Sequence, residues 1–319
     1  MFDVITFGSA IRDAFFYSED FTTQNRDLCF HLGAKIEVDK IHFTTGGGGT
    51  NSACAFSRLG FKTAIVGQIG NDVGGRAVLE DLKKDKVEAK FVVQTEKFNT
   101  AYSVILSIPG KERTILVYRG ASENIDENII PWSKLKAKWF YVSSVGGDFK
   151  LIEKIFSCAE ENKIKVVINP GAKELAHPEK LLPFLQRADI VLLNDSEAEK
   201  MTGISSEKMP ELMNDLSTRI SGMAVITCGA KGTWAVSNKK IYQASILPVK
   251  VIERTGAGDA FGAGFVAGLM KIDDITYALQ LGTANATSVI GKIGAKNGLL
   301  SKKDLDSFQK VRVEKTITK

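Results

Sequence analysis

The sequence contains no apolar run of 18 residues, and its first residues lack the charged and apolar segments of an export signal. It also contains no basic tract with interleaved aromatic residues, although 42 basic residues outnumber 37 acidic ones. The first absence makes a membrane partner unexpected, and the second does the same for a nucleic-acid partner. We therefore expect a cytoplasmic protein with neither kind of partner.

Cysteine and histidine are also scarce. The four cysteines are far apart in the sequence and form no CxxC pair, which disfavours a disulfide framework and a zinc site. The three histidines are dispersed, and no nucleophile motif lies near them. A Ser/His/Asp hydrolase and a histidine-rich metal site are therefore disfavoured as well.

Short, β-branched apolar runs alternate along the chain with helical patterns. The runs lack the polar alternation of half-exposed strands, which predicts strands buried on both faces. Apolar residues recur at helical spacing in 151–161 and 207–220, and Asp273 and Asp274 suit the start of a helix that ends near Ile290. We predict an α/β fold with a mainly parallel sheet, in a single domain of 319 residues. The predicted strands are Val4–Phe7, Thr63–Val66, Trp139–Val142, Lys165–Ile168, Ile190–Leu193 and Ala224–Thr227.

Two regions, residues 13–43 and 98–119, depart from this pattern. They contain period-two stretches and no good helix, and in the second region a Pro109-Gly110 turn separates two strand-like segments. We expect these regions to form a small sheet that is inserted into the α/β body. Such a sheet would cover a site as a lid.

The segment 253–261, ERTGAGDAF, is the most informative one in the chain. It follows a strand-like stretch and precedes an apolar helical pattern. Glycines at a helix start allow backbone N–H groups to approach an anion, and the helix dipole favours negative charge there. Asp259 would repel a bound phosphate unless it accepts a proton as the phosphoryl group arrives. The pattern therefore predicts phosphoryl transfer with Asp259 as the base.

A second glycine-rich segment, Gly46 to Gly49, also precedes a helical pattern. A ligand can lie against bare backbone there, and Asn51 can exchange hydrogen bonds with ligand hydroxyl groups. A flexible loop is the alternative interpretation. Asp13 follows the first strand and could bind ligand hydroxyls or close a turn. Arg113, in the lid, could reach a substrate or a phosphate, or lie exposed on its strand.

Polar residues also follow two other predicted strands. Asn194 to Glu197 comes directly after a buried strand, at the end where open α/β sheets bind ligands. These residues could form a helix capping box, or Glu197 could act on a magnesium ion through water. Thr227 to Gly232 follows another buried strand, and its glycines would allow a nucleotide to approach the backbone. A plain β-turn is the alternative for this loop.

Taken together, these segments resemble the ribokinase-like (PfkB) family of carbohydrate kinases, in the family's order and over nearly the whole chain. The family's two signatures correspond to Gly46–Asn51 followed by Arg58-Leu59-Gly60, and to Thr255–Asp259. Further matches are Phe7-Gly8-Ser9 with Asp13, Val66-Gly67 with Gly70 to Gly75, the NxxE motif Asn194–Glu197 and the TxGxxG loop Thr227–Gly232.

The resemblance implies a ribokinase-like three-layer α/β/α sandwich with a mainly parallel central sheet and a small β-sheet lid. It also implies that ATP, with Mg²⁺, phosphorylates a hydroxyl of a small sugar, as in ribokinase or fructokinase. The amides of Gly256, Ala257 and Gly258 would then form an anion hole, and lid closure would exclude water. The other implied roles are sugar binding by Asp13, Gly47, Gly48 and Asn51, ATP binding by Asn194, Thr227, Gly229, Gly232 and Asn285, and Mg²⁺ binding by Glu197 through water.

Two departures from the family leave alternatives open. Gly48 replaces the lysine that ribokinases usually carry, so a nucleoside of the adenosine or cytidine type is the alternative acceptor. Glu253 replaces an aspartate that helps to hold a monovalent cation in potassium-dependent members, so K⁺ activation is open. A homodimer formed through the lid is open too. A non-catalytic sugar or nucleotide sensor is disfavoured, because a sensor has no need of a base such as Asp259 in an anion hole.

Overall fold

The body of the protein is a ten-stranded sheet within residues 1–25, 27–108 and 113–317, which the computed structural model describes. The strand order is β16-β15-β14-β13-β12-β11-β10-β1-β6-β7. Neighbours from β13 to β7 pair in parallel, whereas β13 to β16 pair antiparallel. The strands are β1 (Phe2–Phe7), β6 (Thr63–Gly70), β7 (Glu88–Thr95), β10 (Ala137–Val142), β11 (Lys165–Ile168), β12 (Ile190–Asn194), β13 (Met223–Thr227), β14 (Thr233–Ser237), β15 (Lys240–Ala244) and β16 (Val313–Ile317).

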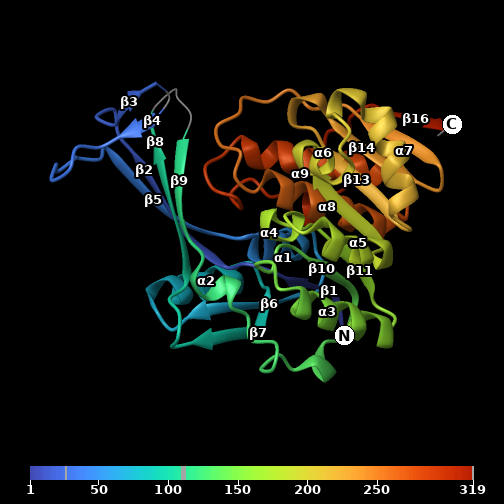
Figure 1. The fold of residues 1–319 in the computed structure, drawn as a ribbon, viewed down its shortest axis with the longest axis horizontal. Helices are drawn as coiled ribbons and strands as arrows, with labels where there is room; N and C mark the ends of the chain where they lie inside the picture. The colour runs from blue at the N-terminus through green and yellow to red at the C-terminus, as the bar shows by residue number, and fades with distance from the viewer. Residues whose placement is uncertain (26, 109–112, 318–319) are drawn as a thin grey trace.

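Helices cover both faces of this sheet, so the body has three layers (Figure 1). They are α1 (Gly48–Arg58), α2 (Val73–Lys84), α3 (Phe149–Glu161), α4 (Ala172–Leu175), α5 (Pro178–Arg187), α6 (Asp195–Thr202), α7 (Met209–Arg219), α8 (Ala257–Ile272) and α9 (Ile275–Ile290). Successive strand residues point to opposite faces. In β1, Ile5 belongs to the core formed with α3, α5, α6 and α7, whereas Val4 belongs to the core formed with α1, α2, α8 and α9. Burial on both faces explains the continuous apolar runs in the sequence.

The strands and helices predicted from the sequence are present in the body, except that the strand-like stretch before residue 253 is not a strand. All six predicted strands belong to the central sheet. Asp274 caps α9, because its side chain accepts a 2.7 Å hydrogen bond from the Tyr277 amide. Among the described helices, none has the length and apolar character needed to cross a membrane. Short 3₁₀ helices complete the described secondary structure at η1 (Gly120–Glu123), η2 (Trp132–Lys134), η3 (Ser206–Lys208), η4 (Gly229–Lys231) and η5 (Lys302–Asp304).

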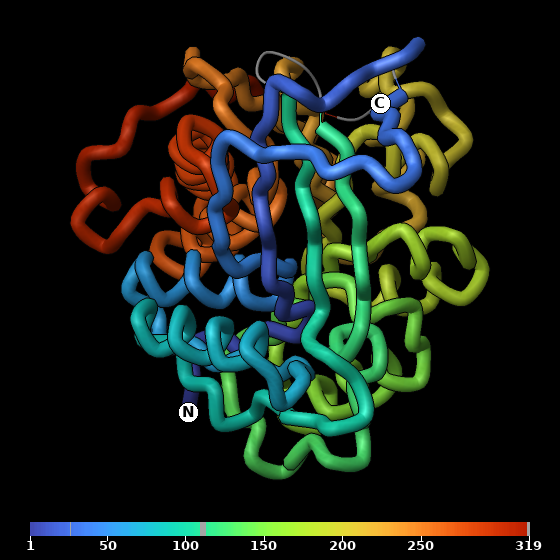
Figure 2. Tube along the Cα trace, turned by 90° about the vertical axis from the view of Figure 1, so that its left-hand side faces the viewer, coloured from blue at the N-terminus to red at the C-terminus, as the bar shows by residue number. Residues whose placement is uncertain are grey.

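A separate four-stranded sheet projects from the body, with its long strands side by side (Figures 1 and 2). Its order is β5-β2-β8-β9, in which β2 and β8 are parallel and the other pairs antiparallel. This small sheet confirms the predicted lid, although its strands extend beyond the predicted bounds, and the Pro109-Gly110 turn lies outside the described residues. Its strands are β2 (Ile11–Tyr17), β5 (Lys40–Gly46), β8 (Ala101–Ser107) and β9 (Arg113–Tyr118), and β3 (Thr22–Gln24) pairs with β4 (Asp27–Cys29) beyond them.

Candidate active site

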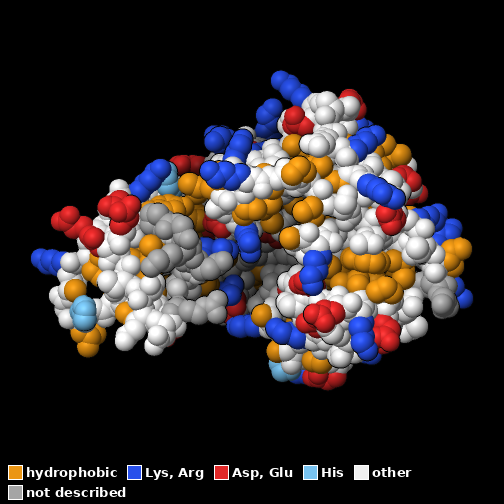
Figure 3. All heavy atoms as spheres, turned by 90° about the horizontal axis from the view of Figure 1, so that it is seen from above, with side chains coloured by type: hydrophobic (Ala, Val, Ile, Leu, Met, Phe, Trp, Pro, Cys, Tyr) orange, Lys and Arg blue, Asp and Glu red, His pale blue; other side chains and the backbone are white. Residues whose placement is uncertain are grey.

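The residues predicted to be functional gather where the small sheet meets the carboxyl ends of the parallel strands. β1 leads into Gly8 and Ser9, β12 ends at Asn194, and β13 ends at Thr227. Carboxyl ends of parallel strands share one edge of a sheet, which is where open α/β folds bind ligands. The view from above shows a hollow between the small sheet and the body, with Lys and Arg side chains on its rim (Figure 3).

Asp259 is in the first turn of α8 and faces the glycine-rich segment that starts α1. The Asn51 side chain donates a 2.8 Å hydrogen bond from Nδ2 to Asp259 Oδ2. A Cβ atom placed on Gly48 would lie 3.4 Å from Asp259 Oδ1, so this carboxylate oxygen faces bare backbone. Burial raises the pKa of the Asp259 carboxyl, against the opposing effects of the Asn51 hydrogen bond and the charge of Lys296. The fold thus joins two motifs that lie 208 residues apart.

The turn before α8 is built to present backbone amides. Gly256 caps the helix in a left-handed conformation, with φ 78°, and a Cβ atom there would collide with Ala295 at 2.4 Å. Glu253 Oε1 closes the turn by accepting hydrogen bonds from the amides of Arg254 and Thr255, at 2.7 and 3.0 Å. A Cβ atom on Gly258 would meet nothing within 4 Å, so the first turn opens into free space. Helix starts of this kind stabilise anions.

Asp13 supplies a second carboxylate on the opposite side of the site. It lies in β2, is buried, and has a hydrogen bond with Ser103 on the neighbouring strand β8. Burial raises the pKa of Asp13 to about 6, against the opposing effects of Ser103 and of the charge on Lys296. A Cβ atom on Gly46 would lie 2.1 Å from Asp13 Oδ2, so the carboxylate rests directly on this glycine.

Two further predicted residues complete this side. Gly47 adopts φ 97°, and a Cβ atom on it would meet the Ser9 carbonyl oxygen at 2.4 Å. Asn51 Oδ1 is buried and has no hydrogen-bond partner among the described residues. A buried acceptor without a partner is costly, and a ligand hydroxyl can satisfy it. Asp13, Asn51 and the glycine-rich backbone therefore form a surface suited to hydroxyl groups.

On the other side of Asp259 lies a cavity of about 630 Å³. The predicted residues Thr227, Gly229 and Gly232 line it together with Ala257 and Gly258. These two residues belong to the turn 253–258, which is predicted to bind an anion and is called the anion-binding turn below. Its apolar walls include Val251, Phe261 and Ala286. A mostly apolar cavity that ends in backbone amides fits a nucleotide, with the base against the walls and the phosphates toward α8.

Asn285 does not line this cavity. It is fully buried, where Nδ2 donates to the Ala260 carbonyl at 2.7 Å and Oδ1 accepts from the Leu300 amide at 2.9 Å. These bonds join α9 to α8 and to the segment that follows α9. They give Asn285 a packing role, and its contact with ATP stays a prediction.

Asn194 and Glu197 form the capping box that the sequence left as one of two interpretations. Asn194 Oδ1 accepts from the Glu197 amide at 2.9 Å, and Glu197 Oε2 accepts from the Asn194 amide at 2.8 Å. Burial raises the pKa of the Glu197 carboxyl. The described residues contain no cluster of three or more His, Cys, Asp or Glu side chains able to hold a metal ion. A Mg²⁺ ion near Glu197 would therefore need water and phosphate oxygens as most of its ligands.

Arg113 links the small sheet to the turn before α8. Its Nε lies 3.6 Å from Oε1 of Glu253, the residue that closes this turn. Arg113 belongs to β9, the strand at the edge of the small sheet, so this ion pair spans the hollow between sheet and body. The contact is to the body itself, which neither sequence interpretation of Arg113 foresaw.

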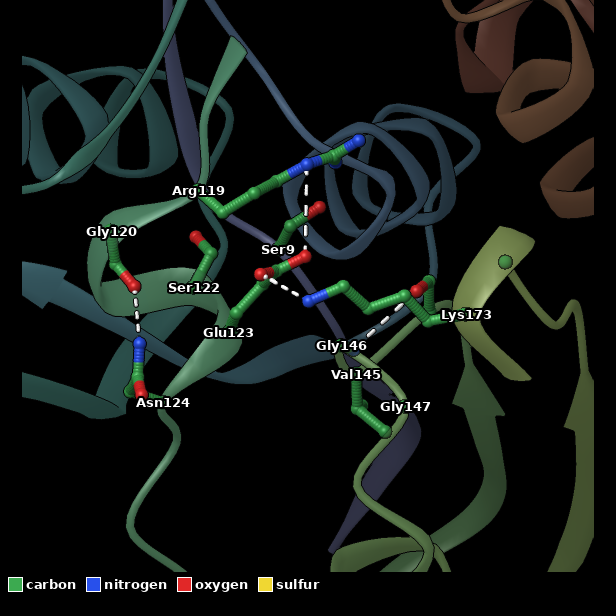
Figure 4. Close-up of polar contacts among 12 residues, drawn as sticks. Ser9, Arg119, Gly120, Ser122, Glu123, Asn124, Val145, Gly146, Gly147 and Lys173 are labelled. Carbon is green, nitrogen blue, oxygen red and sulfur yellow. Dashed lines mark hydrogen bonds and ion pairs between the residues drawn. The ribbon is translucent and has the colours of Figure 1, made fainter. Parts of the chain in front are cut away.

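Sequence reasoning missed a charged group at the end of the small sheet (Figure 4). Glu123 lies between Lys173 and Arg119, at 2.7 and 3.7 Å from their nitrogen atoms. Ser122 beside it bonds both the amide and the carbonyl of Ala10, at 3.1 and 2.9 Å. These contacts hold the segment after β9 against the start of β2. No motif marks the contacts of Glu123 with Lys173 and of Ser122 with Ala10, because these partners are far apart in the chain.

Comparisons with known proteins point to one family. Residues 1–302 match the pfkB family of carbohydrate kinases. The chain is 26% identical to ribokinase from Haemophilus influenzae over 284 residues, which covers 86% of this chain and 90% of the relative. Among solved structures, ribokinase from Arabidopsis thaliana in complex with ribose and ATP superposes with a TM-score of 0.82 at 21% identity, covering 96% of this chain and 99% of that one.

A nucleoside kinase has the same fold. The structure of a nucleoside kinase from Methanocaldococcus jannaschii superposes with a TM-score of 0.77 at 21% identity, covering 95% of this chain and 97% of that one. This similarity concerns the fold, whereas the family match spans most of the sequence. The chain belongs to the pfkB family of carbohydrate kinases and is a phosphotransferase with the ribokinase-like fold.

Proposed function

We propose that the protein transfers the γ-phosphoryl group of ATP to a hydroxyl group of a small sugar, with Asp259 as the general base. The observation that carries this proposal is the position of Asp259, between the hydroxyl-binding surface at Asn51 and the start of α8. An acceptor hydroxyl bound against Gly48 lies within reach of the Asp259 carboxylate, and the raised pKa of this carboxyl makes it a stronger base.

The chain's own groups have separate tasks in this reaction. Asp259 accepts the proton of the acceptor hydroxyl, and the amides of Gly256, Ala257 and Gly258 stabilise negative charge at the transferring group. Asp13 and Asn51 orient the acceptor through its other hydroxyls. ATP supplies the phosphoryl group, and Mg²⁺ offsets the charge of its phosphates. Glu197 would hold Mg²⁺ through water, beside phosphates that lie near Asn194.

The acceptor is proposed to be a sugar of the ribokinase or fructokinase kind. Gly48 bears on this choice, because a Cβ atom there would lie 2.9 Å from the side chain of Ser143. A side chain at this position would require Ser143 to shift, and with Gly48 the space before Asp259 is left to the acceptor. A nucleoside is the second candidate, since the Methanocaldococcus jannaschii neighbour is a nucleoside kinase.

Three further features of the function stay predictions. Activation by K⁺ is testable by comparing turnover in sodium, potassium and a bulky organic cation. A homodimer through the small sheet is supported by the edge strand β9, where Ile115, Leu116, Val117 and Tyr118 are exposed. Sedimentation analysis measures this association. A cytoplasmic location is testable by cell fractionation.

A panel of sugars and nucleosides, each incubated with ATP and Mg²⁺, tests the proposed function. We expect ADP formation that depends on a free-sugar acceptor. Phosphorylation of a nucleoside, with no turnover of any sugar, would favour the second candidate. Binding of ligands without any phosphorylated product would favour a sensor and contradict the proposal.

A further inference from the structure

Lys296 is a buried lysine that none of the sequence motifs includes. Its side chain is 6% exposed, and it follows α9 in the segment 293–297. The ammonium group donates to Thr45 Oγ1 at 2.6 Å and pairs with Asp81 Oδ2 at 3.2 Å. Thr45 Oγ1 also donates to Asp81 Oδ2, so the three side chains form one network. A buried charge is costly unless it is paired and hydrogen-bonded, as this one is.

The backbone of Lys296 is held as well, by a hydrogen bond from α1. Arg58, at the end of α1, donates from Nη1 to the Lys296 carbonyl at 2.5 Å. Two more nitrogens of Arg58 bond the Asp85 carboxylate, at 2.8 and 2.9 Å, which fixes the guanidinium group. The segment 293–297 is therefore attached to β5, α1 and α2 at once.

The neighbours of Lys296 contact both halves of the active site. Ala295 lies directly beneath Gly256, where it would meet a Cβ atom at 2.4 Å, and so supports the turn that presents the amides. On the other half, Thr45 precedes Gly46, the glycine on which the Asp13 carboxylate rests. A single short segment thus connects the anion-binding turn to the hydroxyl-binding surface.

The charge of Lys296 also acts on both site carboxyls. It opposes the rise in pKa that burial causes at Asp13 and at Asp259. The other charged or titratable groups around this network are Asp81 and Lys84 from α2, Asp85 directly after α2, Arg58 and Cys54 from α1, Arg12 from β2 and Glu253 from the turn before α8. Removing the ammonium group therefore makes both carboxyls harder to ionise.

We propose that Lys296 is a positioning residue that holds the anion-binding turn and the hydroxyl-binding surface at the separation needed for phosphoryl transfer. This inference rests on the proposed function of Asp259 and Asp13. Lys296 acts through Ala295 on one side and through Thr45 on the other, and Thr45 and Asp81 occupy its ammonium group. Misplacement of reacting groups by about 1 Å costs on the order of 10²-fold in rate, so holding the two halves of the site at a fixed separation matters for catalysis.

The test compares Lys296→Met with the double variant Lys296→Met/Asp81→Asn and with the control Lys292→Met. Lys292 is exposed in the same part of the chain. Measured for each are kcat, the KM values for acceptor and ATP, the pH dependence of kcat/KM, the melting temperature, and hydrogen exchange of residues 44–46 and 255–259. The double variant leaves no unpaired charge behind, so it keeps the test valid if the single variant does not fold.

We expect Lys296→Met to lower kcat by about 10²-fold, to move the acid limb of kcat/KM to higher pH and to speed exchange in both segments. The double variant should recover thermal stability without recovering kcat or the pH profile, and Lys292→Met should match the wild type. Recovery of kcat and the pH profile together with stability would reduce Lys296 to a structural ion pair and overturn the proposal. Wild-type kcat and exchange in Lys296→Met would also overturn it.

The exchange measurement separates this inference from the proposed function. If the wild-type protein phosphorylates no sugar or nucleoside, the proposed function fails. The exchange of residues 44–46 and 255–259 in Lys296→Met still decides whether Lys296 connects the two segments. Faster exchange in both supports the connection, and unchanged exchange in either contradicts it.

Discussion

The α/β body and the small sheet contribute to one site but differ in how they are held. In the body, strand β12 is buried on both faces, with Val191 fully inaccessible, and packed helices surround it. In the small sheet, the outer strand β9 has Leu116 56% exposed. The body holds Asp259 and the anion-binding turn, to which the proposed function assigns the chemical step. The small sheet holds Asp13 and Arg113, which reach the site from a more loosely packed element.

On the proposed function, this difference places proton transfer in the body, and it gives the small sheet a share of acceptor binding through Asp13. Changes in the body should act mainly on kcat, whereas changes in the small sheet should act mainly on the KM for the acceptor. Variants of the body should therefore have larger effects on activity than variants of the small sheet.

Asp259→Asn tests the body. We expect the rate of ATP-dependent phosphorylation to fall by about 10²–10⁴-fold, because the amide cannot accept the proton. Nucleotide binding and the melting temperature should remain close to wild type, since Asn keeps the size of the side chain. A rate within about tenfold of wild type would show that Asp259 is not the base.

Gly46→Ala tests the surface under Asp13. The new Cβ atom would lie 2.1 Å from Asp13 Oδ2, and the flexible carboxylate can move away, so folding should survive. Loss of one hydrogen bond to a charged group should raise the KM for the acceptor by roughly 10- to 100-fold. Gly291→Ala is the matched control, because a Cβ atom there meets nothing closer than 3.6 Å. An unchanged KM in Gly46→Ala would argue that Asp13 does not bind the acceptor.

Protonation of Asp13 should lower activity but raise the stability of the folded protein. Its pKa is raised from an ordinary 3.8 to about 6, so kcat/KM should fall below about pH 6 as the carboxyl gains a proton. The folded state binds that proton more tightly than the unfolded state. The free energy of unfolding should therefore gain roughly 3 kcal/mol from this group at low pH, and lose it as pH rises through 6.

Asp13→Asn checks this assignment, because the variant cannot titrate at that position. Its free energy of unfolding, measured by denaturant titration between pH 4 and 7, should lack the part of the pH dependence that Asp13 contributes. A profile identical to that of the wild type would contradict the assignment.

Arg113→Ala tests the contact between the small sheet and the body and should have the smallest effect. The ion pair with Glu253 is partly exposed, and such pairs contribute about 0.2–1 kcal/mol, so the KM for the acceptor should rise by about two- to fivefold with little change in kcat. Arg312→Ala serves as control, since Arg312 forms an exposed ion pair with Glu314 in the body. A large fall in kcat would show that Arg113 acts on the transferring group.

Much of the fold could be predicted because a strand that is buried on both faces is apolar along its whole length. The six apolar runs all belong to the central sheet, whereas its antiparallel strands β14, β15 and β16 and its edge strand β7 carry mixed patterns and were not predicted. In the small sheet, the alternation of side-chain character predicted strands but not which strands pair with each other. The parallel pairing of β2 with β8 joins segments some 90 residues apart, and local patterns carry no information on such register.

In the candidate active site, the sequence alone predicted the residues whose roles are local, namely the glycines of the two turns and Asp259, and it offered the capping box at Asn194 as one of two interpretations. Backbone conformation and helix capping depend on neighbours in the chain, so a motif can specify them. Three contacts could be seen only in the folded protein: Asn51 bonds Asp259, Asn285 joins α8 to α9, and Lys296 connects the two halves of the site. These contacts depend on the packing of distant segments around buried polar groups, where the energy of an unpaired atom enforces a partner that no local pattern specifies.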